Sequence, residues 1–233
     1  MRNIYNKKEW EKSYKNFDNF LFLPHEEVVR FSSKYIRKKI GVNKYKNLTE
    51  NINEKSILDL GCGIGRHAIF FDDLGLNSFG IDLSEEAILF SKKWAIDLNK
   101  RELANRLIEG NIKNLPWKDS FFDFAVSHGV LDSMQFDIAK DACKELSRVL
   151  KPSGLFYCDL ISGDDSNHSR EYSGEEIINT PHEEGTIQTF YNFEKIKDLL
   201  GNCFYIEECF LIRRENILNG GYSSRYHLIL KNF

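Results

Sequence analysis

An acid, three alternating glycines and an arginine lie together near residue 60. Residues 56–66 read Ser-Ile-Leu-Asp-Leu-Gly-Cys-Gly-Ile-Gly-Arg, and a second apolar stretch follows at residues 69–71. This order predicts a strand, a turn and the start of a helix. Glycines permit positive φ and let a ligand lie against bare main chain, while the N–H groups at a helix start attract an anionic or polar group. The residues that could bind such a ligand are Asp59, Gly61, Cys62, Gly63, Gly65 and Arg66.

A second acid ends the next apolar segment. Residues 77–82 are expected to form a strand whose last residue, Asp82, lies seventeen positions after Gly65. An acid about 20 residues beyond a glycine turn is placed to accept the hydroxyls of a ribose, and the carboxyl end of such a strand faces the ligand crevice. The structural alternative is a cap for the following helix, but Ser84 already supplies that cap. We therefore predict that Asp82 and the adjoining Leu83 contribute to the binding site.

The glycine spacing distinguishes between two kinds of ligand. A dinucleotide-binding turn has the pattern Gly-x-Gly-x-x-Gly, whereas here the third glycine comes one position early and Arg66 stands in its place. The string D-L-G-C-G-I-G at residues 59–65 instead resembles motif I of the class I S-adenosylmethionine-dependent methyltransferases. The string L-K-P-S-G at residues 150–154 also resembles that family. The resemblance spans roughly residues 50–233 and implies S-adenosylmethionine as the cofactor.

The resemblance also implies roles for residues after the third and fourth strands. In the family, an acid after the third strand meets the adenine amino group; Asn111 stands at that position, and its amide oxygen can still accept from the amine. The next residue, Ile112, would stack on the base. Ser127 and His128 end the fourth strand, where the run S-H-G-V-L-D resembles the small-molecule branch of the family rather than the base-modifying one. His128 could contact the methionine part of the cofactor, act as a base, or be a satisfied structural histidine.

The elements that must position these residues alternate regularly from residue 55. Alternating strand and helix patterns predict a parallel sheet covered on both faces. We expect a Rossmann-like α/β fold: a seven-stranded, mostly parallel sheet with helices on both faces, a C-terminal antiparallel hairpin and an N-terminal helical extension. The glycines at residues 220–221 indicate the hairpin turn. The expected strands are 57–60, 77–82, 107–109, 121–128, 155–161, 204–213 and 222–231, and the expected helices are 66–74, 84–98, 136–150 and 192–200.

Two segments outside this alternation are candidates for covering the site. Residues 1–54 are expected to form a helical extension and a polar connector (41–54), with helices across residues 5–40, the second starting at Pro24. In similar methyltransferases such an extension covers the cofactor, which makes Trp10 and Tyr14 candidates for its sulfonium side; core packing is the alternative. The methyltransferase domain would comprise residues 55–233.

Residues 161–191 form a polar insertion within that domain. Long irregular segments in a compact domain are usually functional or mobile, so substrate specificity is expected here. The candidate substrate-binding residues are Tyr172, His182 and Tyr191. His182 is the preferred general base, with His128 as the other candidate, although a plain surface histidine is an equal alternative for His182.

Composition excludes several classes of protein. The 233 residues carry a net charge of −3, which argues against nucleic acid as the main partner. No apolar run approaches the roughly 20 residues of a membrane span, and the N-terminus lacks the apolar core of a signal peptide. The five cysteines are scattered without a C-x-x-C pair, so neither a metal site nor a disulfide framework is predicted. These features predict a cytoplasmic protein with a small-molecule substrate, and they leave its oligomeric state open.

The sequence therefore predicts a methyltransferase that moves a methyl group from S-adenosylmethionine to oxygen or nitrogen of a small polar metabolite. A sugar or an amine is the guess for that acceptor. Two alternatives stay open. One is a non-catalytic regulatory subunit that binds S-adenosylmethionine, since a cofactor site does not prove turnover. The other is an NAD(P)-dependent oxidoreductase, which shares the strand, turn and helix.

Overall fold

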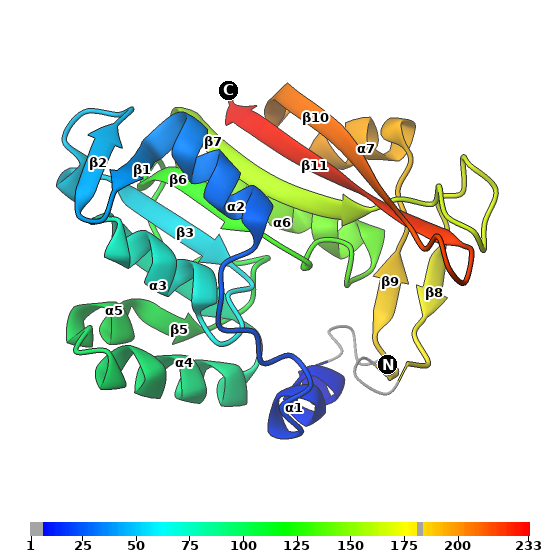
Figure 1. Ribbon diagram of the computed structural model, residues 1–233, viewed down its shortest axis with the longest axis horizontal. Helices are drawn as coiled ribbons and strands as arrows, with labels where there is room; N and C mark the ends of the chain where they lie inside the picture. The colour runs from blue at the N-terminus through cyan, green and yellow to red at the C-terminus, as the bar shows by residue number, and fades with distance from the viewer. Residues whose placement is uncertain (1–6, 181–183) are drawn as a thin grey trace.

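Seven strands form the central sheet of the protein, in a computed structural model that describes residues 7–180 and 184–233 (Figure 1). From edge to edge the order is β10, β11, β7, β6, β3, β4, β5. Strands β3 to β7 run parallel, and β11 runs antiparallel to both of its neighbours. The predicted fold class is confirmed, the C-terminal hairpin included. The strands are β3 (Ser56–Leu60), β4 (Asn77–Asp82), β5 (Leu107–Glu109), β6 (Phe122–Ser127), β7 (Leu150–Ile161), β10 (Phe204–Glu215) and β11 (Tyr222–Asn232).

Alternation along the strands divides the apolar side chains between two covered faces. Ile57 and Phe124 share a buried cluster with helices α2 and α3, whereas their neighbours Leu58 and Ala125 share another with α6 and α7. A third cluster joins α3, α4 and α5 near β5. Because both faces are covered, the central strands are apolar almost throughout. The helices are α2 (Glu26–Phe31), α3 (Arg66–Asp73), α4 (Glu85–Asp97), α5 (Arg101–Arg106), α6 (Phe136–Val149) and α7 (Phe193–Leu200).

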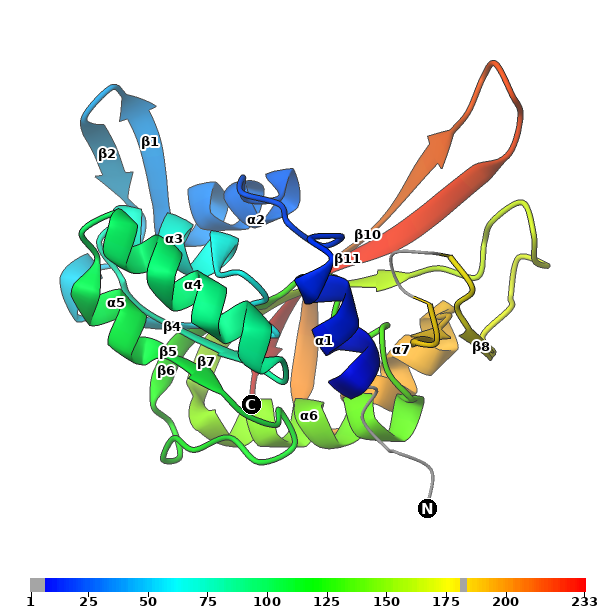
Figure 2. The same ribbon diagram turned by 90° about the horizontal axis from the view of Figure 1, so that it is seen from below.

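The five parallel strands run in the same direction, so their carboxyl ends all lie along one side of the sheet, which we call its carboxyl edge. Helix α1 (Lys7–Lys15) lies beyond this edge, between α4 and the loops that follow the strands (Figure 2). Turns after β3, β4, β5 and β6 therefore meet beneath α1. Across the described residues, every helix is too short or too polar to cross a lipid bilayer.

The N-terminal extension differs from its predicted form. The helix expected to run from Pro24 to residue 40 consists of α2 and a π-helical segment, Ser32–Ile36, and then the chain forms a hairpin of β1 (Arg37–Gly41) and β2 (Lys44–Asn47). Part of the expected connector is thus a strand. Pairing places Tyr45 under the Arg37 guanidinium at 4.4 Å, a cation–π contact that the helical pattern did not reveal. The division of the chain at residue 55 stays a prediction.

Two further segments are more ordered than expected. Strand β7 begins at Leu150 and not, as expected, at residue 155. Residues 151–154 form a bulge within the strand, since Phe122 pairs with Leu150 and Phe124 pairs with Leu155. The polar insertion contains a small hairpin of β8 (Glu175–Ile177) and β9 (Ile187–Thr189). Neither addition changes the predicted seven-stranded sheet with its C-terminal hairpin.

Candidate functional site

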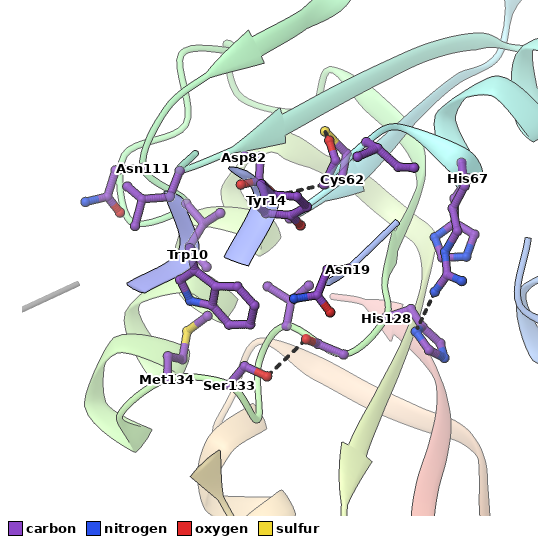
Figure 3. A pocket seen from close by; sticks show the side chains of 18 of the residues that line it. Trp10, Tyr14, Asn19, Cys62, His67, Asp82, Asn111, His128, Ser133 and Met134 are labelled. Carbon is purple, nitrogen blue, oxygen red and sulfur yellow. Dashed lines mark hydrogen bonds between the residues drawn. The ribbon is translucent and has the colours of Figure 1, made fainter. Parts of the chain in front are cut away.

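A cavity of about 290 Å³ lies at the carboxyl edge of the sheet, under α1 (Figure 3). Its walls come from the β3–α3 turn, the end of β4, the loop after β5, the segment between β6 and α6, and α1 itself. Most of the predicted cofactor residues meet there although they are spread over a hundred positions of the chain. Those that line the cavity are Tyr14, Gly61, Cys62, Gly63, Arg66, Asp82, Leu83, Asn111, Ile112 and His128.

The β3–α3 turn requires glycine at two positions for steric reasons. Gly61 and Gly63 have φ of +73° and +53°. A Cβ on Gly61 would lie 2.5 Å from the Val130 side chain, and one on Gly63 would lie 2.6 Å from the Tyr14 hydroxyl. The N–H groups of Gly61 and Cys62 donate to the Ile81 carbonyl, at 2.8 and 3.0 Å, which fixes the turn against β4. Bare main chain therefore forms one wall of the cavity, as the sequence predicted.

Asp82 joins three parts of the site. Its Oδ2 accepts from the Gly63 N–H at 2.8 Å and its Oδ1 from the Ser84 N–H at 2.9 Å. Burial raises the pKa of this carboxyl to about 6, although both backbone N–H groups lower it. Each oxygen has more than one acceptor position, so both can also accept from a ligand. The cap that the sequence offered as an alternative is formed by Ser84, whose Oγ accepts from the Ala87 N–H.

Three predicted residues lie outside the cavity wall. Asp59 is buried, and its Oδ2 accepts from the Ala68 N–H at 3.2 Å, so it fixes the start of α3. Gly65, with φ of +87°, begins the same helix. Ser127 is buried at the end of β6, and among the described residues its hydroxyl has no hydrogen-bond partner. Asp59 and Gly65 thus support the turn, and none of the three residues lines the cavity.

Helix α1 is fastened over the cavity by a carboxylate. Glu11 accepts from the N–H groups of Glu85 and Glu86, at 2.7 and 3.2 Å, and so caps the start of α4. Lys15 adds an ion pair to Glu86. As a result Trp10 and Tyr14, one turn apart, both line the cavity. That they contact the ligand stays a prediction.

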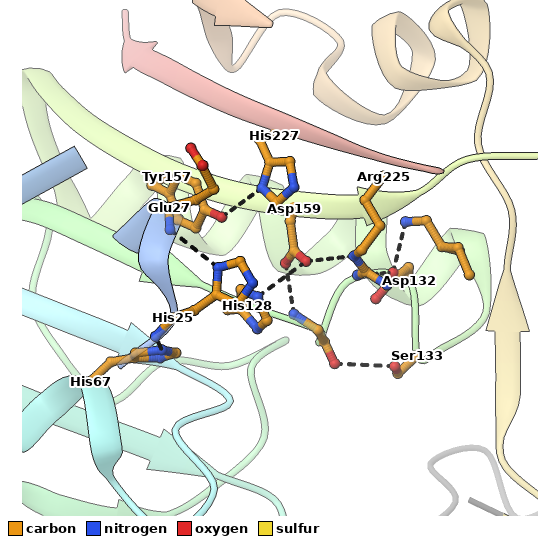
Figure 4. Close-up of polar contacts among 12 residues, drawn as sticks. His25, Glu27, His67, His128, Asp132, Ser133, Tyr157, Asp159, Arg225 and His227 are labelled. Carbon is orange, nitrogen blue, oxygen red and sulfur yellow. Dashed lines mark hydrogen bonds and ion pairs between the residues drawn. The ribbon is translucent and has the colours of Figure 1, made fainter. Parts of the chain in front are cut away.

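His128 lies at the inner end of the cavity within a group of four histidines (Figure 4). The ring centroids of His128 and His25 are 4.0 Å apart, His67 lies 5.7 Å from His128, and His227 lies 5.9 Å from His25. Burial lowers the pKa of His128 to about 3 and that of His25 to about 4. Both rings are therefore neutral at physiological pH.

The neighbours of His128 define its tautomer. The Arg66 guanidinium, which can only donate, lies 3.4 Å from Nδ1. The opposite nitrogen, Nε2, lies 3.5 Å from Asp159 Oδ2. The arrangement therefore favours a proton on Nε2, facing the carboxylate, and leaves the Nδ1 lone pair toward Arg66. The position of the ring proton of His128 is thus assigned from its two partners.

Asp159 is held charged beneath His128. Burial alone would raise the pKa of this carboxyl, but Arg225, His128 and the Gly129 N–H more than offset burial and lower it to about 2. Arg225 Nε donates to Asp159 Oδ2 at 2.7 Å, and its Nη2 donates to Asp132. The Gly129 N–H donates to Asp159 Oδ1 at 2.7 Å. A buried, fully bonded carboxylate thus faces the histidine.

The predicted substrate residues of the insertion do not line this cavity. Tyr191 is fully buried and its hydroxyl donates to the Leu131 carbonyl at 3.1 Å, so the structure places it in the core. Tyr172 stacks on His168, with centroids 4.1 Å apart, and donates to Glu176. His182 lies outside the described residues. The insertion reaches the cavity through Ile187 of β9 instead.

Sequence reasoning missed several wall residues. They share no motif: Asn19 and Leu21 come from the loop after α1, His67 follows the glycine turn, and the segment between β6 and α6 supplies most of the others. Only the four-residue spacing along that last segment could have indicated a common face. Its cavity-lining members are Val130, Met134 and Ile138, with Gly129, Ser133 and Gln135 beside them.

The family of methyltransferase domains matches residues 58–158, a range that includes the glycine turn, Asp82 and His128. A crystal structure of an S-adenosylmethionine-dependent methyltransferase from Methanosarcina mazei has the same fold, with a TM-score of 0.64 over 78% of this chain and 93% of that one, at 23% identity. Residues 58–158 of this chain thus match the methyltransferase-domain family, and the chain shares the fold of this solved structure. Both findings support the resemblance to class I S-adenosylmethionine-dependent methyltransferases that the sequence motifs indicate.

Curated relatives of the methyltransferase domain act on different acceptors. The chain is 31% identical over 117 residues to malonyl-[acyl-carrier protein] O-methyltransferase of Pectobacterium atrosepticum, covering 50% of this chain and 43% of that protein. It is 37% identical over 115 residues to a ubiquinone/menaquinone biosynthesis C-methyltransferase of Rickettsia prowazekii, covering 46% and 44%. The matched segment thus spans less than half the length of each relative.

Proposed function

We propose that this protein is an enzyme that transfers the methyl group of S-adenosylmethionine to an oxygen or nitrogen of a small molecule. The observation that carries the proposal is the convergence, on one cavity, of the glycine turn, Asp82 and a buried neutral histidine, His128. The first two suit a nucleoside-containing cofactor. The third suits proton removal from an acceptor.

The residues on the cavity wall fit the cofactor. Gly61 and Gly63 line the cavity and carry no side chain of their own, so a ligand can contact the main chain there. Asp82 would accept the ribose hydroxyls, Ile112 would stack on the adenine and Asn111 would accept from its amine. Arg66 lines the cavity and forms no ion pair with a described residue, so it is available for a carboxylate. When bound, S-adenosylmethionine supplies a methyl carbon already activated by the sulfonium charge.

The protein then has two tasks, alignment of the acceptor and removal of its proton. In our proposal His128 takes that proton on Nδ1 once Arg66, whose contact there is long at 3.4 Å, has turned to an anionic ligand. Nε2 lies 3.5 Å from Asp159 Oδ2, without a hydrogen bond among the described residues, and the negative charge of the carboxylate stabilises the imidazolium that forms. His182, the preferred base from sequence, stays a prediction because it lies outside the described residues.

The acceptor is proposed only at the level of a class. Trp10, Leu21, Met134 and Ile187 give the cavity an apolar wall, and a few polar groups face it. Such a cavity suits a small organic molecule rather than nucleic acid, and the five free cysteines accord with the proposed cytoplasmic location. Sugars and amines stay first in the acceptor panel, followed by carboxylic acids and quinols because of what the relatives are named for.

The test is a methyl-transfer assay with radiolabelled S-adenosylmethionine and that acceptor panel, on the wild type and on His128→Ala. The proposal predicts transfer to at least one acceptor by the wild type and its loss in the variant, with cofactor binding retained by both. Tight cofactor binding without transfer to any acceptor would favour the non-catalytic regulatory subunit. The NAD(P)-dependent alternative predicts nicotinamide binding in the same titration, and the glycine spacing argues against it.

A further inference from the structure

The sheet ends at β10 without a covering element. Among the described residues, β10 is the last strand in the order, and its backbone ladder is with β11 alone. A bulge lies between Ile206 and Glu208, and from Glu208 to Glu215 the register is unbroken. Figure 2 shows this hairpin extending away from the body of the molecule. Long regular edges attract further strands, and natural proteins usually protect them.

The unbroken part of this edge is complementary to itself. In an antiparallel pairing of two copies centred on Leu211, Glu208 lies opposite Arg214 and Phe210 lies opposite Ile212. Phe210, Leu211 and Ile212 are 55%, 42% and 43% exposed, although all three are large and apolar. Opposite charges and apolar pairs facing each other across strands both stabilise a sheet. From Glu208 to Arg214 the pattern is acidic at one end, apolar in the middle and basic at the other.

The pairing is compatible with two-fold symmetry. A two-fold axis perpendicular to the sheet keeps every side chain on its own face, so residues opposite each other must be separated by an even number of positions. Glu208 and Arg214 meet this condition, and so do Phe210 and Ile212. Glu208 already bonds to Lys34 and Tyr35 of its own chain, but both contacts use Oε1. Its Oε2 is left for Arg214 of a second copy.

The tip of the hairpin extends the complementarity. Ile217 and Leu218 at the tip are 84% and 94% exposed. Ile217 and Tyr205 each lie six positions from Leu211, which is about 20 Å at about 3.3 Å per residue. In the paired strands the tip of one copy would therefore reach Tyr205 of the other. Tyr205 packs on Phe233 with centroids 3.8 Å apart, and the two are 57% and 50% exposed. The tip is preformed, because Asn216 Oδ1 accepts from the N–H groups of Leu218 and Asn219.

We propose that two copies of this chain associate through β10 into an isologous dimer with a continuous sheet. The surface is formed by residues 205–218, and it lies away from the cavity wall, which contains no residue of β10. Cofactor binding is therefore independent of the dimer. Each copy retains its own complete cavity.

The experiment is sedimentation equilibrium of the full chain and of Leu211→Asp. The wild type is expected to show the mass of two chains. The variant is expected to show the mass of one, because the pairing would place the introduced carboxylates of the two copies opposite each other. Titration with S-adenosylmethionine checks that the variant is folded. A wild type with the mass of one chain at every concentration would overturn the proposal, and so would a dimer that survives the substitution. Neither result bears on the methyltransferase activity.

Cross-linking tests the register. Leu211→Cys in a Cys209→Ser background places a thiol opposite its own copy, so mild oxidation should give a disulfide-linked dimer. Leu89→Cys in the same background is the matched control. Leu89 is 57% exposed on α4, and α4 packs near β5, at the opposite end of the sheet from β10. Equal cross-linking of both variants would show random collision and contradict the pairing.

Discussion

At the scale of single residues, Asp82 both fixes the backbone around it and faces the cavity. Its two oxygens hold the turn at Gly63 and the segment at Ser84, and it lines the cavity at the same time. Burial raises its pKa to about 6, so the carboxylate is charged at neutral pH but close to protonation. Only the charged form accepts from two ligand hydroxyls without donating a proton of its own.

Cofactor affinity is therefore expected to fall in mild acid. Below about pH 6 Asp82 becomes protonated, and the dissociation constant for S-adenosylmethionine should rise by up to about tenfold per pH unit. Calorimetric titration between pH 8 and pH 5 measures this slope. Asp82→Asn cannot titrate, so it should bind more weakly at every pH and with a flat profile. A wild-type profile that is equally flat would show that Asp82 does not bind the ligand.

The histidine group allows a second residue-scale prediction. His128→Asn should lower the methyl-transfer rate by roughly 100-fold or more, the usual contribution of a general base, while cofactor affinity is kept. The control is His25→Asn: His25 Nδ1 accepts from the Glu27 N–H at the start of α2, and asparagine can fulfil the same capping role. Comparable losses in both variants would mean that the group is structural.

The pH dependence of turnover adds an independent check on His128. Its pKa is lowered to about 3 by burial first and by His25, His67 and Arg66, against the opposing effect of Asp159. The base is thus neutral throughout the working range. At saturating cofactor, the turnover number should stay level from pH 8 down to about pH 5. A fall centred near the ordinary histidine value of about 6.5 would contradict this assignment.

At the scale of elements, α1 is a removable wall of the cavity. It is held chiefly by Glu11, which caps α4, and by ion pairs such as Lys15 to Glu86. Exposed ion pairs contribute little, so the cap is the decisive contact. Trp10 and Tyr14 line the cavity from α1, so in the proposed complex they would reach the ligand only while this contact persists.

Loss of the cap should weaken binding without unfolding the sheet. Glu11→Ala is expected to cost about 0.5–2 kcal/mol, the usual range for a helix cap, which raises the cofactor dissociation constant about 2- to 30-fold. Titration measures the affinity, and the melting temperature should fall by at most about 8 °C, which is what about 2 kcal/mol implies for a chain of this length. Asp18→Ala, an exposed acid just beyond α1, is the matched control. A large fall in melting temperature would show that α1 belongs to the core.

Features that depend on neighbouring residues could be predicted from the sequence, whereas contacts between distant residues could not. Strand β4 and its final Asp82 were predictable, because an apolar run and an acid at its end are local patterns. The cap from Glu11 to α4 was not, since it joins residues 74 and 75 positions apart. Tyr191 illustrates the opposite error: its type suited substrate binding, but burial against α6 decides its role, and burial is a property of the fold.

At the scale of the whole molecule, the site depends on the sheet order. His128 directly follows β6 and Asp159 lies near the end of the neighbouring strand β7, whereas Arg225 comes from β11, which runs antiparallel beside β7. The C-terminal hairpin thus supplies the cation that keeps Asp159 charged under the histidine. The sequence indicated the hairpin through its glycines, but the contact follows from the register of Arg225 with Ile161.

Ligand binding should stabilise the whole domain. At a cofactor concentration about 100 times the dissociation constant, binding adds about 2.7 kcal/mol to the free energy of unfolding. For a protein of this size, that is a rise of roughly 5–10 °C in melting temperature. Differential scanning fluorimetry with S-adenosylmethionine measures it, with NADH at the same concentration as the control. A shift with NADH alone would favour the oxidoreductase alternative.

The central claim is that the cavity binds S-adenosylmethionine through the glycine turn and Asp82. The most direct measurement is isothermal titration of the protein with S-adenosylmethionine and with its demethylated product, on the wild type, on Asp82→Ala and on Asp97→Ala, an exposed acid of α4. We predict micromolar or tighter binding that the Asp97 variant keeps. The Asp82 variant should lose at least about tenfold, since hydrogen bonds to a charged group contribute about 1.5–3 kcal/mol each. Absence of binding by the wild type, or equal binding by all three proteins, would contradict the claim.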